Sequence, residues 1–389
     1  MAFNTLKVEN FLRRVSAASI KKYATASEAV QVQEEPPVHF RTAESNPVNH
    51  TTQHQERFYT IPNDVYKKLY SGGGLPKEFM KQVKTFNECC FLTRSPTIEI
   101  LSYLRNTNYN KPVNRYVLYG PSGCGKTLSM AHILHYGLAT QKVLIHIPWA
   151  PNWFRHPKEV ANSTTREGYV DLPIDAAAWL IHFKNQNSQL LEQLKLTTDK
   201  EYTWSLREST PRGVPLMQLI DLGINRVRYA SEIIIALTSE LKEASIAGKC
   251  QTLVMIDGYN IFFTDRTRVF TDAKAMVLPD KVSLTIAALE MTKYDWCNGA
   301  VVVSVDQLAV GGKKESDLPR LLLGKAGFEH LDPFMPVSVN PYTDSEFYNV
   351  MDYFKDRRWV RNCDDEGLQE LKLLSAKNGF KLMNLCAAL

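Results

Sequence analysis

The stretch from Arg115 to Thr127 constrains the fold of this chain more than any other. It begins with Arg-Tyr-Val-Leu-Tyr, a β-branched and aromatic run that is typical of a buried strand. Gly-Pro-Ser-Gly-Cys-Gly-Lys-Thr follows at once and fits G-x-x-x-x-G-K-[ST], the pattern of a phosphate-binding loop, or P-loop. Apolar residues then recur at helical spacing from Leu128 to Leu138. This succession predicts an α/β fold of the P-loop type, with a glycine-rich turn that binds nothing as the alternative.

The residue types of the loop suit a nucleotide phosphate. Glycines allow backbone N–H groups to curl around an anion, and the positive end of the following helix dipole would face it. The Lys126 ammonium would meet the β- and γ-phosphates, and the Thr127 hydroxyl would meet Mg²⁺. We therefore predict a nucleotide-binding segment that consists of Gly120, Ser122, Gly123, Cys124, Gly125, Lys126, Thr127 and Leu128.

A second landmark is the apolar strand Thr252 to Ile256, which is followed directly by Asp257. A P-loop protein needs a further carboxylate to hold Mg²⁺, directly or through water. Many parallel strands end in Asp without binding anything, but this Asp lies downstream of a P-loop. We predict that Thr127 and Asp257 are the metal ligands.

We assign no catalytic residue. ATPases of the additional-strand class usually place a Glu after this Asp to polarise the attacking water, whereas this chain has Gly258. A third strand, from Gly299 to Val305, is also followed by polar residues. Ser304, Asp306 or Gln307 could touch the γ-phosphate side or could be ordinary polar residues at a strand end. We expect hydrolysis to be slow, absent or served by another residue.

Composition sets the class of protein. The chain has 389 residues, 44% of them hydrophobic, which is ordinary for globular proteins. Its net charge of +5 includes +3 from the first thirty residues, so the body is not a strongly basic nucleic-acid binder. No apolar run approaches the 18 or so residues of a membrane span. The seven cysteines include no C-x-x-C pair, which indicates reduced thiols and neither a disulfide framework nor a zinc site.

The amino-terminal part differs in composition from the rest. Residues 1–30 intersperse Lys and Arg with Phe, Leu, Ser and Ala and contain few acids, as a mitochondrial presequence does; a disordered basic tail is the alternative. Residues 31–57 are rich in Gln, Glu, Pro and His and indicate an extended, unpacked arm. We expect the nucleotide-binding α/β domain over residues 58–340 and a helical carboxyl-terminal lobe over residues 341–389.

Other segments complete the expected domain. Strands are predicted over residues 142–147 and 334–339, and a helix over 96–106 either helps to enclose the base or covers the sheet edge. Apolar positions recur at helical spacing from Leu216 to Leu241, with a mild break at Gly223. Thr-Lys-Tyr-Asp at 292–295 superficially resembles the guanine-reading motif of small GTPases. We discount it because that motif follows a strand and this segment precedes one.

A series of segments in a fixed order resembles one known family. They are Arg115–Gly120 with Gly125–Ser129, His146–Pro148, Trp204 with Arg207–Thr210, Gly223–Arg228, Val254–Asn260, Asp295–Trp296, Leu323–Lys325 and Leu331–Phe334. The chain resembles the death-associated protein 3 family, the P-loop GTP-binding proteins of the mitochondrial ribosome's small subunit. The resemblance covers about residues 58 to 389.

The resemblance implies properties that the residues alone do not. These are an AAA+-like P-loop domain with mostly parallel sheet, bound GTP or GDP with Mg²⁺, the mitochondrial matrix as location, and mitochondrial ribosomal proteins and small-subunit rRNA as partners. A structural ribosomal protein that holds a guanine nucleotide, with at most slow GTPase activity, is then the leading hypothesis. An active GTPase or AAA+-type NTPase switch in ribosome assembly, and a pro-apoptotic interaction protein, are the alternatives.

Overall fold

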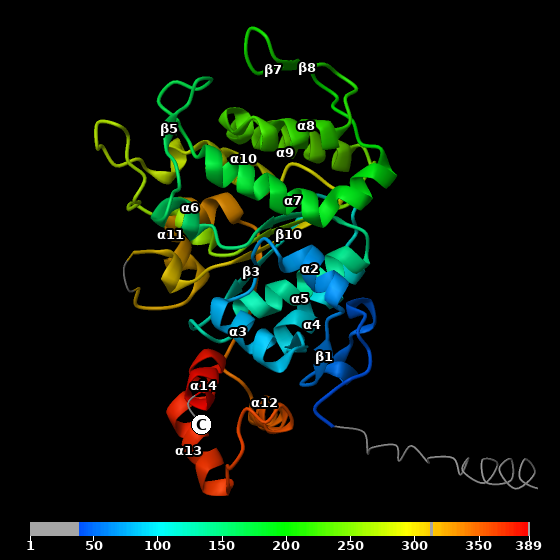
Figure 1. The fold of residues 1–389 in the computed structure, drawn as a ribbon, viewed down its shortest axis with the longest axis vertical. Helices are drawn as coiled ribbons and strands as arrows, with labels where there is room; N and C mark the ends of the chain where they lie inside the picture. Colours follow the sequence, from blue (N-terminus) through cyan, green and yellow to red (C-terminus); the bar gives the residue numbers. More distant parts are fainter. Residues whose placement is uncertain (1–38, 312–313, 388–389) are drawn as a thin grey trace, which may run out of the picture. The chain divides into compact units, whose positions relative to one another are not determined.

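The computed structural model describes residues 39–311 and 314–387 (Figure 1). By its internal contacts the chain divides into two units, Met1–His39 and Phe40–Leu389. The predicted presequence over residues 1–30 lies outside the described residues. None of the described helices is long and apolar enough to cross a membrane.

The centre of the second unit is a five-stranded sheet in which every neighbouring pair is parallel. Its strands, in chain order, are β3 (Asn114–Tyr119), β4 (Val143–Ile147), β9 (Thr252–Ile256), β10 (Gly299–Ser304) and β11 (Met335–Ser338). All five strands expected from the sequence are therefore present. Their spatial order is β11-β3-β10-β9-β4, so β10 lies between the strand that leads into the P-loop and the strand that leads to Asp257.

Helices cover both faces of the sheet, with α7 to α10 on one side and α4 and α5 on the other (Figure 1). Alternate residues of each strand enter the two cores: Val301 and Val303 pack on one face, Ala300 and Val302 on the other. Burial on both faces explains why the inner strands β9 and β10 are almost continuously apolar. The helices are α4 (Ser95–Asn106), α5 (Lys126–Ala139), α7 (Pro173–Leu194), α8 (Leu216–Asn225), α9 (Ala230–Ile246) and α10 (Ser283–Met291).

The long stretch between β4 and β9 holds α6 (Pro151–Arg155), α7, α8 and α9, together with two small hairpins. The hairpins pair β5 (Ala161–Asn162) with β6 (Val170–Asp171) and β7 (Tyr202–Thr203) with β8 (Ser209–Thr210). The sequence predicts a mild break at Gly223 in the apolar periodicity from Leu216 to Leu241. In the structure the break lies instead at residues 226–229, between α8 and α9. A Cβ at Gly223 would lie 2.4 Å from Leu180 Cδ1, so this glycine serves close helix packing.

The expectation of an unpacked arm is wrong for residues 40–57. Phe40 enters a hydrophobic core, and the fully buried His50 lies 2.9 Å from His132 (Nδ1 to Nε2). Composition missed this packing because a few well-placed aromatic rings anchor an otherwise polar segment. Beyond it lie β1 (Phe58–Thr60), α2 (Asn63–Tyr70), α3 (Lys77–Phe86) and β2 (Cys90–Leu92), with β1 and β2 paired antiparallel.

The carboxyl-terminal lobe is helical, as the sequence predicts. After α11 (Pro319–Leu331) and β11 come α12 (Asp344–Asp356), α13 (Asp365–Ser375) and α14 (Gly379–Cys386). A capping box starts α12, in which Thr343 and Glu346 each bond the backbone N–H of the other. The lobe shares its core with Phe58, Phe86 and Cys90, so it packs on the segment that precedes the P-loop.

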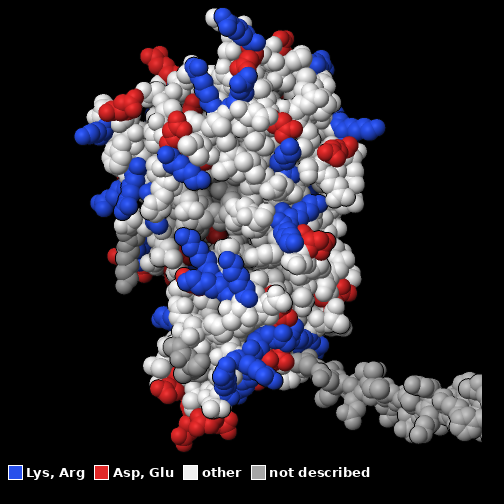
Figure 2. Space-filling model, viewed as in Figure 1, with Lys and Arg blue, Asp and Glu red and all other residues white. Residues whose placement is uncertain are grey.

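Lys and Arg side chains form separate groups on the face in Figure 2, with acidic and uncharged areas between them. This mixed surface agrees with the small net charge of the body.

Candidate nucleotide-binding site

The P-loop turns sharply out of β3 and into the first turn of α5. Gly120, Gly123 and Gly125 have φ of +133°, +83° and +99°, in the region that favours glycine. A Cβ on Gly120 would lie 2.4 Å from the carbonyl oxygen of Val339, so no side chain fits there. The three glycines therefore allow a sharp turn between β3 and α5, which begins at Lys126.

The Lys126 ammonium is buried and its three donors are used. Nζ lies 2.5 Å from the carbonyl oxygen of Gly120, 3.1 Å from that of Pro121 and 2.9 Å from Asp306 Oδ2. Asp306 thus forms an ion pair with Lys126, the residue that the P-loop pattern predicts to bind the phosphates.

Asp257 lies where the sequence predicts it, at the carboxyl end of β9 beside the loop. Its Oδ2 accepts a 2.7 Å hydrogen bond from Thr127 Oγ1, and its Oδ1 accepts one from the Ser304 hydroxyl. Burial raises the pKa of the Asp257 carboxyl to about 6, with both hydrogen bonds opposing the shift. Thr127 and Asp257, the two predicted metal ligands, are in contact.

The three polar residues after β10 differ in position. Ser304 bonds Asp257, and Asp306 pairs with Lys126, so both belong to the site. Gln307 instead donates a hydrogen bond to Asp317. Asn260 fixes the backbone of Asp306 through two hydrogen bonds, from its Nδ2 to the carbonyl oxygen and from the Asp306 N–H to its Oδ1.

Gly258 occupies a position where a side chain is excluded. Its φ is +73°, and a Cβ would lie 2.7 Å from Cδ of Pro151 and 3.1 Å from the Trp149 ring. The glutamate that polarises water in the additional-strand ATPases therefore has no space here without a rearrangement of α6. The sequence showed that this Glu is missing, and the packing shows why.

The carboxyl-terminal lobe covers the loop from outside. The Phe380 N–H donates to the carbonyl oxygen of Gly123 at 3.0 Å, and Asn378 Nδ2 donates to that of Ser122 at 2.8 Å. Cys124 faces the lobe, with its Sγ 3.4 Å from Asn378 Nδ2, and burial raises the pKa of its thiol. Of the predicted binding residues, Gly120 and Cys124 thus support the loop from behind.

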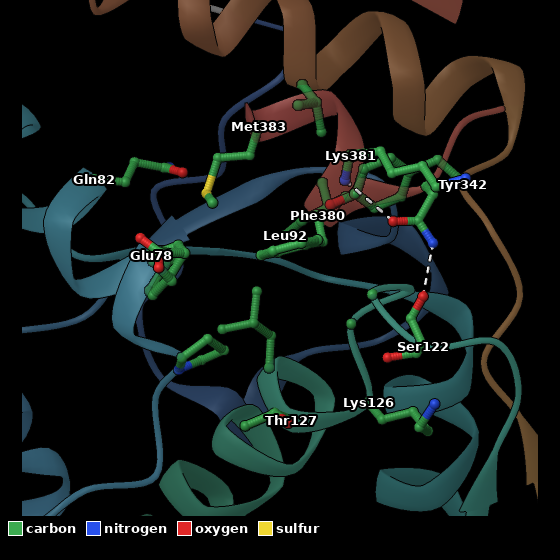
Figure 3. Close-up of a pocket in the computed structure, with 18 of the residues that line it drawn as sticks. Glu78, Gln82, Leu92, Ser122, Lys126, Thr127, Tyr342, Phe380, Lys381 and Met383 are labelled. Carbon is green, nitrogen blue, oxygen red and sulfur yellow. Dashed lines mark hydrogen bonds between the residues drawn. The ribbon is translucent and has the colours of Figure 1, made fainter. Parts of the chain in front are cut away.

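The other six predicted residues line a cavity of about 370 Å³ (Figure 3). This volume lies in the range of small-molecule sites. Its loop end carries Lys126, Thr127 and Asp306, and its opposite end is mainly apolar. The apolar end is lined by side chains from α3, β2 and α14 as well as by Leu128. The segment before the loop therefore helps to enclose the cavity, while α4 packs against α5.

These residues fit a nucleotide with Mg²⁺. A buried ammonium, the Thr127 hydroxyl and the amino end of a 14-residue helix meet at one end of the cavity, and the Asp257 carboxylate contacts that hydroxyl. Lys126 would exchange some of its contacts with Gly120, Pro121 and Asp306 for phosphate oxygens. Thr127 and Asp257 would hold the metal, whose charge would offset that of the phosphates. Among the described residues, no group of three or more His, Cys, Asp or Glu side chains is placed to hold a metal ion. The metal at this site would therefore depend on phosphate oxygens of the nucleotide as further ligands.

The discounted segment at 292–295 lies away from the site. The carbonyl oxygen of Thr292 accepts from Arg115 Nη1, near the start of β3, whereas the P-loop follows the end of that strand. Asp295 pairs with Lys242. Sequence reasoning missed Arg94 and Asn378, which contact the loop from distant parts of the chain, because no local pattern marks them.

Comparisons with known proteins give one consistent result. The chain matches the family model "Mitochondrial ribosomal death-associated protein 3" over residues 91–385. It is 37% identical over 353 residues to "Small ribosomal subunit protein mS29" of Mus musculus, covering 90% of this chain and 89% of the relative. The protein of the same name from Bos taurus is 38% identical over 353 residues, 90% of this chain and 88% of that relative.

Proposed function

Because the chain belongs to the mitochondrial ribosomal death-associated protein 3 family, we propose that it is a structural protein of the mitochondrial small ribosomal subunit that binds a guanine nucleotide with Mg²⁺. It acts in the mitochondrial matrix and supports mitochondrial translation. Its partners are mitochondrial ribosomal proteins and small-subunit rRNA. The near-neutral body favours binding held largely by protein neighbours, since rRNA phosphates require many Lys and Arg contacts.

The single observation that carries the nucleotide part is that Lys126 and Thr127 line one end of the cavity and that Asp257 contacts the Thr127 hydroxyl there. These residues come from the P-loop and from β9, which are separated by β10 in the sheet. Strand order β11-β3-β10-β9-β4, with this additional strand, favours an AAA+-like P-loop NTPase fold.

The bound nucleotide acts as a structural ligand in this proposal. A ligand that binds only the folded state stabilises it by about 2.7 kcal/mol at a concentration one hundred times its Kd. The cavity lies between the α/β domain and α14, so the nucleotide would hold the two together. Exclusion of a side chain at Gly258 favours binding over turnover.

The experiment is to extract the nucleotide from small subunits purified from mitochondria and to identify it by chromatography and mass spectrometry. We expect about one guanine nucleotide per subunit. Subunits assembled with the double variant Gly125→Ala plus Lys126→Ala should lack it and should assemble poorly. Normal nucleotide content and normal assembly with this variant would overturn the proposal. The exposed Lys111→Ala is the matched control.

An active NTPase switch remains the second candidate, and one observation favours it. Asp306 lines the cavity beside Lys126 and could serve as the base that position 258 lacks. Multiple-turnover hydrolysis by the purified protein, lost in Asp306→Asn, would support this function. A pro-apoptotic role rests on the family name alone. Loss of an apoptotic response with translation intact would support it as a separate role.

A further inference from the structure

The apolar end of the cavity contains two polar side chains that the phosphate site does not use. Glu78 and Gln82 lie one turn apart on α3, and Figure 3 shows them on the far side of the cavity from Ser122 and Lys126. Around them are Phe79, Leu92 and Met383. An apolar pocket with a small number of polar groups is how proteins orient a planar ligand.

Gln82 is only 8% exposed, and its carboxamide has no hydrogen-bond partner within residues 39–311 and 314–387. The amide nitrogen and oxygen are not fully buried, so they are accessible to solvent or to a ligand in the cavity that Gln82 lines. Its side chain extends from α3 toward Met383 on α14 (Figure 3). Gln82 therefore offers one acceptor and two donors to whatever occupies this end.

Glu78 provides an ionised acceptor beside it. Within the part of the chain that the structure describes, its ion pair is with Lys81 at 2.7 Å. The Lys81 side chain is 75% exposed, so the pair holds the carboxylate weakly. The other carboxylate that lines the cavity, Asp306, is engaged by Lys126 at the loop end. Of these two carboxylates, Glu78 is therefore the one that can accept hydrogen bonds from a nucleotide base.

We propose that Glu78 and Gln82 form hydrogen bonds with the Watson–Crick edge of the base and that Glu78 selects guanine. This inference rests on the proposed nucleotide site. Guanine presents two adjacent donors on this edge, N1–H and the N2 amino group, and a carboxylate has two acceptor oxygens. Adenine presents one amino donor beside the N1 lone pair, which would face the second carboxylate oxygen unfavourably. Gln82 satisfies the remaining polar atoms of the edge, since its amide both donates and accepts.

The test measures the Kd values of GDP, IDP and ADP with Mg²⁺ for the purified full chain by calorimetry. IDP lacks only the N2 amino group of guanine. We expect the wild type to prefer GDP over both, and Glu78→Gln to reduce each preference by about 10- to 100-fold, as for other bidentate base contacts. Gln82→Leu should weaken GDP binding. Lys81→Ala is the matched control, because it removes the ion pair and keeps the carboxylate.

The outcomes separate this inference from the function on which it rests. If the wild type bound GDP and Glu78→Gln left both Kd ratios unchanged, base reading by Glu78 would be wrong while the nucleotide site stood. If the wild type bound none of the three, both proposals would fail. The ratios come from the folded fraction of each variant, so a modest loss of stability does not obscure them.

Discussion

The Arg94 guanidinium is joined to the Glu346 carboxylate by two hydrogen bonds, from Nε to Oε1 at 3.0 Å and from Nη2 to Oε2 at 2.9 Å. Its third nitrogen, Nη1, donates to the carbonyl oxygen of Cys124 in the P-loop at 2.6 Å. Both side chains are buried. One arginine thus links the loop to the capping box of α12, and hence the nucleotide site to the carboxyl-terminal lobe.

Replacement of Arg94 by Ala should lower the free energy of unfolding by about 3–5 kcal/mol, because it leaves Glu346 charged, buried and unpaired. Urea denaturation measures this change. Arg361→Ala, at an exposed site, is the control and should change stability by less than about 0.5 kcal/mol. A loss below about 1 kcal/mol in Arg94→Ala would show that the pair does not anchor the lobe.

Removal of the metal should weaken nucleotide binding through Asp257. In the wild type we expect EDTA to raise the Kd of GDP at least about tenfold, because Thr127 and Asp257 would hold a divalent ion whose charge offsets that of the phosphates. Asp257→Asn can keep its contact with Thr127 but loses the charge, so its Kd should respond little to EDTA. Equal EDTA effects in the two proteins would remove Asp257 from the metal site.

Asp306→Asn should strengthen GDP binding, by up to about tenfold. The variant frees the Lys126 ammonium from its 2.9 Å ion pair and removes a negative charge from the phosphate end of the cavity. Titration calorimetry gives the comparison, with Asp317→Asn as the control outside the cavity. Weaker binding in Asp306→Asn would mean that the aspartate contributes to the ligand site itself.

Stability should fall between pH 7 and pH 5 because of histidines that are buried in the neutral form. Burial lowers the pKa of His135 and of His182 to about 4, against 6.5 in the unfolded chain. The unfolded state therefore binds protons first as the pH falls, and each histidine subtracts about 2 kcal/mol by pH 5. The free energy of unfolding in urea at the two pH values gives the slope. His182→Gln should reduce it, and an unchanged slope would contradict the assignment.

Gly258 and Gly168 provide a matched pair for testing the excluded side chain. Their φ angles are +73° and +76°, but a Cβ at Gly168 would meet nothing within 4 Å. Gly168→Ala should therefore cost only the backbone strain, about 1–2 kcal/mol, while Gly258→Ala should cost more because of the contact with Pro151. Thermal unfolding compares them. Equal losses would show that α6 yields and that position 258 could accept a glutamate.

The sequence predicted the parts of the site that lie close together along the chain. Loop, strand and helix are contiguous from β3 to α5, and Asp257 directly follows its strand, so local patterns identify them. The meeting of these parts depends on strand order, which apolar runs do not specify. The family was identified from a series of segments that resemble it in the same order, and not from the spacing of apolar residues.

Long-range contacts explain what the sequence could not predict. Arg94 and Glu346 are 252 positions apart, and Asn378 and Ser122 are 256 apart. Each looks like an ordinary polar residue in its own segment, and only the packed lobe gives it a role. The break at residues 226–229 was missed for a similar reason, because two helices in one core show the same apolar periodicity as one.

The cover of the P-loop by α14 also has a consequence during synthesis. A ribosome that makes this chain releases β3 and the loop long before it reaches Asn378 and Phe380, so the nascent protein carries an open loop whose outer wall does not yet exist. The side of the cavity that α14 forms is complete only when this last described helix has been synthesised. Nucleotide binding would therefore distinguish a chain that has been translated through α14 from one that ends before this helix.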